Sequence, residues 1–446
     1  MPVNSGNKYI VAVVGAGPAG LFAARQLALA GAHVALFNRD IKPGGLAEYG
    51  IFPDKHKMKE GLRKQFRNLL AMPQIDYFGY VTVGAAGDLS LDDLRAAGFQ
   101  AVLVTVGAQG TKWLGLPGEN LRGVYHAKDL VYHYNKLPPY STQEFAIGQR
   151  VAIIGVGNVM LDIAHWLVHD LKVDEVTAVA RRGPSEVKFD KAEMEYVAAN
   201  LDVGALDAEL ERVRARVEAV GHDIGHARTY ILAGLAGAEA PVSETRFRLE
   251  FLGSPHRIVE DGQGGVAGLE VEETLLVAAG NDTKAKGTGT FRVILADTVV
   301  FAIGDKVDES FGLPVKWNAF VKHPAPRFPV AGLSYEAYDP EANAPVEGVF
   351  VAGWSREAST GLVGAARKDG TNGAEAVKQY LETLPPLGET SYEALCAKLR
   401  AQNKPVIGKD DWLRLEDAED AEAKRLGLAE FKFATDEEML RAMGRV

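Results

Sequence analysis

The segment Gly15-Ala16-Gly17-Pro18-Ala19-Gly20 follows an apolar run at residues 9–14 and precedes a helix-like stretch at residues 19–29. This order predicts a strand, a glycine turn and a helix. In such a turn the first glycine permits the bend, the second lets the backbone approach a pyrophosphate, and the third allows close helix packing, while the helix N-terminus attracts the anion. We therefore expect a dinucleotide to contact Gly15, Gly17, Pro18, Ala19 and Gly20.

The next expected strand, at residues 33–37, is followed by Asn38. In dinucleotide-binding units an acidic residue at about this spacing from the glycines binds the adenosine ribose. Asn can still accept one hydrogen bond, so we predict that Asn38 contacts the ribose. The alternative is that Asn38 only starts a turn, in which case Asp40 is the substitute ligand.

A second glycine loop, Gly155-Val156-Gly157-Asn158-Val159-Met160, lies between an apolar run at residues 150–154 and a helix-like stretch from Leu161. Met160 stands at the third small position and weakens the match. The following strand, at residues 175–180, leads directly into Arg181 and Arg182. Arginines pair bidentately with a 2′-phosphate, whereas an acid would repel it, so the pair favours NADP over NAD. The alternative is an ordinary solvated arginine pair.

The composition indicates a large globular chain. Its 446 residues are enough for two or three domains, with 47% hydrophobic and 24% charged residues. No apolar run approaches the roughly 20 residues that span a bilayer, and the N-terminal apolar stretch belongs to the glycine unit. We expect neither a signal peptide nor membrane insertion, and a cytoplasmic location. The net charge of −10 argues against binding to nucleic acid.

The single cysteine, Cys396, excludes an intrachain disulfide, a CxxC redox pair and a four-cysteine iron–sulfur or zinc site. The ten histidines show no metal-binding spacing, so we predict no metal. An electron relay within this chain must then be organic, which indicates a flavin.

Two similar apolar runs, at residues 101–106 and 298–303, end at Gly107 and Gly304. Each predicts a strand after which the chain crosses from one domain to the other. We predict an α/β protein with two Rossmann-like domains. The FAD domain would be discontinuous, with residues 1–108 and 325–446, and the NADP domain, residues 109–324, would be inserted into it.

A third candidate segment combines an expected strand ending at Gly353-Trp354 with a helix that begins after Thr360-Gly361. A helix N-terminus aimed at the flavin would stabilise the negative charge that reduction brings, and Gly361 would let a nicotinamide approach. The alternative is a plain strand, turn and helix.

Basic residues gather in two stretches that could dock an acidic carrier protein. The alternative is that both are solvated helix faces. The two groups are Lys55, Lys57, Lys59, Arg63, Lys64 and Arg67, and Arg212, Arg214 and Arg216.

Taken together, these motifs resemble the ferredoxin-NADP reductases of the adrenodoxin reductase type, which are two-dinucleotide-domain flavoproteins. The resemblance extends nearly from end to end. Beyond the two glycine loops it includes Gly45-Leu46, Tyr49-Gly50-Ile51, Pro53-Asp54, Asp162, Arg181-Arg182-Gly183-Pro184, Glu193, Gly353-Trp354, Thr360-Gly361-Leu362-Val363, Asp411-Trp412, Glu416-Asp417-Ala418-Glu419 and Glu438-Met439-Leu440.

The resemblance implies two cofactors and a set of residues for each. FAD would contact the first glycine loop, including Ala19. Its other contacts would be Asn38, Gly45, Leu46, Val83, Gly353, Trp354, Gly361, Leu362 and Val363. NADP(H) would contact Val156, Gly157, Asn158, Val159, Arg181, Arg182, Glu193 and Gly361.

The chain departs from the family at two positions. Asn38 replaces the family's Glu at the ribose, and Lys55 stands where a His is expected after Pro53-Asp54, with His56 displaced by one. In the family that His works with the aspartate that matches Asp162. Either a Lys55–Asp162 ion pair or a shifted His56 could replace it as a proton relay, although Lys and His differ greatly in pKa.

The implied function is transfer of a hydride from NADPH to FAD, followed by release of single electrons to a ferredoxin-like or flavodoxin-like carrier, reversible in principle. One alternative is a related subunit, such as a glutamate synthase small subunit or a bifurcating transhydrogenase subunit. The lack of cluster cysteines and the Pro53-Asp54 motif argue against it. The other alternative is a flavin redox sensor without turnover.

Overall fold

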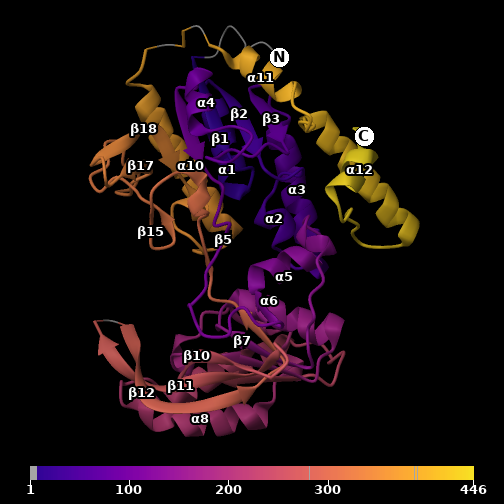
Figure 1. Cartoon of the computed structure of the whole chain (residues 1–446), viewed down its shortest axis with the longest axis vertical. Helices are drawn as coiled ribbons and strands as arrows, with labels where there is room; N and C mark the ends of the chain where they lie inside the picture. Colours follow the sequence, from indigo (N-terminus) through magenta and orange to yellow (C-terminus); the bar gives the residue numbers. More distant parts are fainter. Residues whose placement is uncertain (1–7, 281, 386, 389, 446) are drawn as a thin grey trace. The chain divides into compact units, whose positions relative to one another are not determined.

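The computed structural model describes residues 8–280, 282–385, 387–388 and 390–445 (Figure 1). They form two compact units. The first comprises the described parts of Met1–Thr111, Tyr132–Thr142 and Gly304–Val446, and the second comprises those of Lys112–Val131 and Gln143–Ile303.

The first unit is built on a six-stranded sheet in the order β17-β18-β4-β1-β2-β3. All neighbours are parallel except β17, which pairs antiparallel with β18. The apolar β1, β2 and β4 are buried on both faces, as expected of parallel strands covered by helices. The strands are β1 (Tyr9–Val14), β2 (Ala32–Asn38), β3 (Ile75–Gly79), β4 (Ala101–Val104), β17 (Glu336–Asp339) and β18 (Ala344–Val351).

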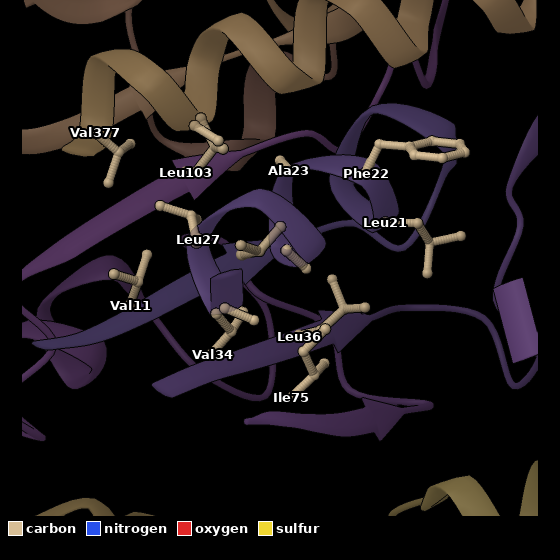
Figure 2. Packing of buried hydrophobic residues seen from close by; sticks show 14 of the residues in the cluster. Val11, Leu21, Phe22, Ala23, Leu27, Val34, Leu36, Ile75, Leu103 and Val377 are labelled. Carbon is tan, nitrogen blue, oxygen red and sulfur yellow. The ribbon is translucent and has the colours of Figure 1, made fainter. Parts of the chain in front are cut away.

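Helix α1 (Pro18–Leu29) packs between this sheet and α10 (Val363–Leu381). Figure 2 shows Leu21 and Leu27 of α1 gathered with Val34 of β2 and Val377 of α10 in one buried cluster. A Cβ at Gly370 of α10 would lie 2.1 Å from the carbonyl oxygen of Ala19, so only glycine permits this approach of the two helices. The close contact joins the C-terminal part of the chain to the first glycine loop.

Other helices cover the rest of the first unit. They are α2 (Leu46–Tyr49), α3 (His56–Leu70), α4 (Leu91–Ala96), α11 (Tyr392–Arg400), α12 (Lys409–Leu426) and α13 (Asp436–Ala442). None of the helices in the described residues is long and apolar enough to cross a membrane.

The second unit has a five-stranded parallel sheet in the order β6-β13-β7-β8-β9. It also has a three-stranded antiparallel sheet in the order β10-β11-β12. Leu269 and Val271 of the antiparallel sheet pack with Ile154 and Phe301 of the parallel one. The strands are β6 (Val124–His126), β7 (Arg150–Ile154), β8 (Glu175–Val179), β9 (Arg246–Glu250), β10 (Gly253–Glu260), β11 (Val266–Ala279), β12 (Asp282–Leu295) and β13 (Thr298–Phe301). The helices are α6 (Asn158–Trp166), α7 (Lys191–Met194), α8 (Val203–Glu218) and α9 (Ile224–Leu232), and α5 (Ala127–Tyr134) begins here and ends in the first unit.

The inserted unit ends at Ile303, earlier than the boundary near residue 324 that the sequence suggested. The reason is pairing and packing within the first unit. Strand β14 (Asp305–Lys306) pairs with β5 (Gly110–Thr111), and Phe311 and Phe320 join the cluster that contains Val14. Residues 132–142 also return to the first unit, because Tyr132 and Leu137 pack on Tyr49.

Candidate dinucleotide sites

The first glycine loop joins the carboxyl end of β1 to α1. Gly15 has a φ of 104° and its N–H donates to the Phe37 carbonyl at 2.8 Å. A Cβ at Gly20 would lie 1.9 Å from the Gly15 oxygen, so the helix begins as close to the strand as the chain allows. A Cβ at Gly17, the residue that precedes α1, would meet nothing within 4 Å. Open space at a helix N-terminus without a side-chain cap fits a bound pyrophosphate.

Two further segments converge on this loop. The Gly44 N–H donates to the Ala16 carbonyl at 2.7 Å, and a Cβ at Gly45 would lie 3.1 Å from the Gly17 Cα. A Cβ at Gly353 would lie 2.7 Å from that of Ala19. The structure therefore brings together the predicted residues of the first loop, Gly45 and Gly353. Leu46 follows as the first residue of α2, and Val83 is buried in the cluster beneath β1 and β4.

Asn38 ends β2 and is buried beside the loop. Its Oδ1 accepts from the Ala16 N–H at 3.0 Å, and its Nδ2 donates to the carbonyls of Asp40 and Lys42 at 2.8 and 2.9 Å. The side chain thus ties the glycine loop to the turn after β2, a role that sequence reasoning missed. Its contact with a ribose stays a prediction.

The connection from β18 to α10 carries the second set of predicted flavin residues. Its turn, η8 (Gly353–Ser355), begins with Gly353 at a φ of 66°, and the Trp354 indole N–H donates to the Thr360 carbonyl at 3.0 Å. Leu362 is exposed and stands at the N-cap of α10, directly after Gly361. The indole bond therefore closes the loop that leads into the helix N-terminus.

Asp369 of α10 holds this connection in place, and sequence reasoning missed it. Its carboxylate accepts from the Gly353 N–H at 2.6 Å, from the Tyr335 hydroxyl at 3.0 Å and from Arg356 at 2.7 Å. Thr105, also missed, places its hydroxyl within 2.9 Å of the Val14 carbonyl and 2.8 Å of the Gly15 carbonyl. Thr105 lies 90 positions from Gly15, and Asp369 lies 16 positions from Gly353 on the helix that follows, so neither contact shows in a local sequence pattern.

The second glycine loop lies in the second unit and repeats the strand, loop and helix order. The Gly155 N–H donates to the Val179 carbonyl at 3.0 Å, and a Cβ at Gly157 would meet nothing within 4 Å. Asn158 exchanges two hydrogen bonds with Asp190, at 2.8 and 2.7 Å. Met160 at the third position is fully buried, so the unit accommodates it in its core. Val159 is exposed on the first turn of α6.

The two predicted phosphate-binding arginines follow β8. Arg181 is exposed, whereas Arg182 is half-buried and its Nη1 contacts Asp282 at 2.8 Å and the Thr283 carbonyl at 3.2 Å. Glu193 lies in the first turn of α7 in the same unit.

The residues predicted as a proton relay belong to different units. Lys55 ends the helical turn η1 (Pro53–Lys55) and His56 begins α3, both in the first unit, while Asp162 lies on α6 in the second. Their pairing therefore stays a prediction.

The structure corrects the predicted docking role of most basic residues on α3. Lys59 is only 1% exposed and pairs with Glu430 at 2.9 Å; Arg63 binds Glu48 and Glu430, and Arg67 binds Glu416. These internal ion pairs fasten the C-terminal segment. In the second unit, Arg212 and Arg216 likewise pair with Glu273, whereas Arg214 pairs at the surface with Glu211 and Glu218 of its own helix. Of the α3 group, Lys57 and Lys64 are exposed.

A cavity of about 410 Å³ lies between α3 and the C-terminal segment, and a buried charge cluster forms part of its wall. Lys42 contacts Glu48 at 3.0 Å and Glu419 at 2.5 Å, and Lys432 lies 3.2 Å from Glu48. Burial opposes ionisation of Glu48, but Lys42, Lys432 and Arg63 outweigh it and hold the pKa of this carboxyl well below its ordinary value. Burial lowers the pKa of the Lys432 ammonium to about 8 despite the attraction of Glu48.

Comparison with known proteins shows what this arrangement is similar to. Residues 9–214 match the family model of the pyridine nucleotide-disulphide oxidoreductases. The NADPH-ferredoxin reductase FprA of Mycobacterium tuberculosis is 28% identical over 97% of this chain and 98% of its own length. The mitochondrial NADPH:adrenodoxin oxidoreductase of Arabidopsis thaliana is 29% identical over 79% of this chain and 78% of its own length. The structure of Mycobacterium tuberculosis FprA in complex with NADPH matches 98% of this chain with a TM-score of 0.79 and 26% identity.

The fold and the two loops are those of a two-dinucleotide-domain flavoprotein, and the pyridine nucleotide-disulphide oxidoreductase model matches residues 9–214 of it. Within that class, the chain is a homologue of the ferredoxin-NADP reductases of the adrenodoxin reductase type. The predicted α/β fold, with one Rossmann-like unit inserted into the other, is confirmed.

Proposed function

We propose that this protein is an FAD-dependent oxidoreductase that passes electrons from NADPH through FAD to a one-electron carrier such as a ferredoxin. The observation that carries the proposal is the pair of open glycine loops at the carboxyl ends of parallel strands, one in each unit. Two consecutive arginines accompany only the second loop. The relatives named for NADPH and for ferredoxin or adrenodoxin support the same reaction. Because hydride transfer is reversible, the reverse direction is open as well.

In the first unit, the backbone N–H groups at the start of α1 would bind the pyrophosphate of FAD. The open position at Gly17 gives the phosphates room, and the Asn38 amide keeps the loop fixed. Bound FAD supplies a ring that accepts a hydride and releases its electrons one at a time. The N-terminus of α10, at Leu362 and Val363, would favour negative charge beside that ring.

In the second unit, the loop at residues 156–159 and the N-terminus of α6 would bind the pyrophosphate of NADP(H). Arg181 and Arg182 would bind the 2′-phosphate through charge-assisted hydrogen bonds. We assign Glu193 and Gly361 to the remaining coenzyme contacts on the resemblance alone.

Three finer points belong to the proposal. Lys55 or His56, together with Asp162, would hold a proton near the flavin. A flavodoxin-like protein would serve as carrier as well as a ferredoxin-like one. The protein would work in the cytoplasm, consistent with its single cysteine.

Anaerobic titration of the FAD-loaded protein with NADPH tests the proposal. We expect one equivalent of NADPH to bleach the visible absorbance band of the flavin. The same bleaching should require far more NADH. A flavin that NADPH does not bleach would contradict it. Bleaching without reoxidation by any one-electron carrier would instead favour a redox sensor.

A further inference from the structure

The hairpin formed by β15 (Val315–Lys316) and β16 (Ala319–Phe320) carries the most exposed large hydrophobic side chain among the described residues. Trp317, the first residue of its two-residue loop, is 88% exposed. It also has a φ of 61°, in the region that favours glycine. When only the first residue of a two-residue hairpin loop has a positive φ, as here, that residue is ordinarily a glycine. A bulky, exposed aromatic side chain held in such a conformation points to a function beyond the fold.

The hairpin is anchored rigidly below its tip. Lys316 pairs with Ala319, the Val307 N–H donates to the Asn318 carbonyl at 2.9 Å, and the Val321 N–H donates to the Pro314 carbonyl at 2.8 Å. Phe320 is buried and packs on Phe311 with ring centroids 5.4 Å apart. Trp317 is therefore presented on a fixed support, which lowers the entropy lost when a partner covers it.

The support lies beside the predicted flavin segment of the same unit. Strand β16 packs against η8, which contains Gly353 and Trp354. The Lys322 ammonium, two residues after β16, donates to the Arg356 carbonyl at 2.6 Å, and the Arg356 N–H donates to the Gly353 carbonyl at 3.0 Å. A protein seated on the hairpin would thus lie next to the connection that leads to the flavin.

The cation beside Trp317 differs from the three paired cations of α3, although Lys57 and Lys64 of that helix are exposed as well. Lys316 is exposed, and no salt bridge links it to a residue that the structure describes. On α3, by contrast, Lys59, Arg63 and Arg67 are neutralised by internal carboxylates. An exposed tryptophan flanked by an uncompensated cation suits a partner that offers an apolar spot within an acidic surface.

We propose that the tip of the β15–β16 hairpin, with Trp317 as its anchor and Lys316 beside it, docks an acidic one-electron carrier protein. The inference rests on the proposed function, since it names where the carrier of that reaction binds. Trp317 is a binding residue here and takes no part in hydride transfer.

The test compares Trp317→Gly and Trp317→Phe with the unchanged protein. Glycine suits the positive φ, so Trp317→Gly should melt no lower than the parent protein while it removes the indole. With NADPH and an acidic ferredoxin, we expect Trp317→Gly to raise the KM for ferredoxin at least about tenfold. Trp317→Phe should recover much of this loss. Reduction of ferricyanide, a small acceptor that needs no docking, should keep the same rate in all three proteins.

One further variant tests the charge at the hairpin tip, and a second serves as a control at another exposed apolar side chain. Lys316→Glu should weaken ferredoxin binding, and the difference should shrink as salt is added, because exposed charges are screened. Leu29→Ala, which removes an exposed apolar side chain at the end of α1, should change nothing.

Several results would overturn the proposal. One is an unchanged KM for ferredoxin in Trp317→Gly, particularly if Lys57→Ala and Lys64→Ala raise it instead. Another is a parent protein that is dimeric by light scattering at assay concentration and becomes monomeric in Trp317→Gly, since a second copy of the chain would then cover the tip. If the parent protein reduces ferricyanide but no ferredoxin or flavodoxin, the proposed function fails, and the docking assignment fails with it.

Discussion

Arg182, three residues after the end of β8, is held by Asp282 at the start of β12, with 2.8 Å between Nη1 and Oδ1. The same nitrogen donates to the Thr283 carbonyl at 3.2 Å. The contact links the end of a strand in the parallel sheet to the antiparallel sheet of the same unit. It fixes the direction of a guanidinium that the proposed function assigns to the coenzyme phosphate.

Replacement of Arg182 by Ala should therefore reduce the preference for NADPH over NADH. A charge-assisted hydrogen bond contributes about 1.5–3 kcal/mol, which corresponds to roughly a tenfold to hundredfold loss in kcat/KM for NADPH. The kcat/KM for NADH should hardly change. Steady-state kinetics with both coenzymes measures this, with Arg228→Ala, an exposed arginine paired with Asp207 in the same unit, as control. An unchanged preference in both Arg181→Ala and Arg182→Ala would show that the coenzyme assignment is wrong.

Asp282→Asn tests the positioning role separately from the charge of Arg182. We expect a higher KM for NADPH with little change in kcat, because the guanidinium keeps its charge but loses its fixed direction. The effect should be smaller than that of Arg182→Ala. A lower KM would mean that Asp282 competes with the phosphate for Arg182 and that the pair opposes binding.

Gly20→Ala should prevent normal formation of the first dinucleotide site. The new Cβ would lie 1.9 Å from the Gly15 oxygen, and neither backbone segment can retreat without moving α1 from β1. We expect a lower melting temperature and a much reduced ratio of FAD to purified protein. The control is Gly61→Ala within α3, where a Cβ meets nothing within 4 Å and should stabilise the helix by about 0.5–1 kcal/mol. Full FAD content in Gly20→Ala would contradict the assigned role of the loop.

Glu48→Gln should destabilise the first unit strongly. The change leaves the buried Lys42 and Lys432 without one of their carboxylates, and loss of one partner of a buried pair costs about 3–5 kcal/mol. The pKa of Glu48 is held below its ordinary value of 4.5, so its stabilising effect is full above that value and is lost as the pH falls below it. Unfolding measured from pH 7 to pH 3 should therefore show the gap between parent and variant closing in acid. A gap that stays constant over this range would exclude the ionised carboxylate as its cause.

Lys432 changes stability in the same direction as Glu48, but in the alkaline range. Its pKa of about 8 in the folded chain lies below the ordinary value of 10.5, so between these values the unfolded chain binds more protons and stability rises with pH. Relative to Lys432→Met, the parent should gain up to about 1.4 kcal/mol per pH unit between pH 8 and pH 10. Chemical denaturation of both proteins at pH 7, 8, 9 and 10 measures the difference. A flat difference across this range would place the pKa of Lys432 outside it.

The features that the sequence could predict are those encoded within a few neighbouring residues. Each glycine loop needs only a strand, a turn and a helix in succession, so Gly15 and Gly155 could be placed correctly without any partner. The roles of Asn38 and Asp369 depend on carbonyls and amides of other segments, and no pattern around either residue indicates them. The basic residues of α3 were misleading for the same reason, because Glu416 and Glu430, which neutralise Arg67 and Arg63, lie more than 300 positions further along the chain.

The domain boundary shows a similar limit. Gly304 closes an apolar strand, and the structure divides the chain next to it, but the loop-rich stretch that follows looked like part of the insert. Its membership is decided by Phe311 and Phe320, which pack under β1 in the first unit. Two aromatic residues in a stretch without periodicity do not reveal which core they join.

The most direct test of the central claim is NADPH-driven reduction of a ferredoxin by the FAD-loaded protein under anaerobic conditions, followed through the visible absorbance of the ferredoxin. We expect two ferredoxins to be reduced for each NADPH consumed, no reaction after removal of FAD, and only slow reduction with NADH. NADPH that bleaches the flavin while ferredoxins and flavodoxins all stay oxidised would contradict the account.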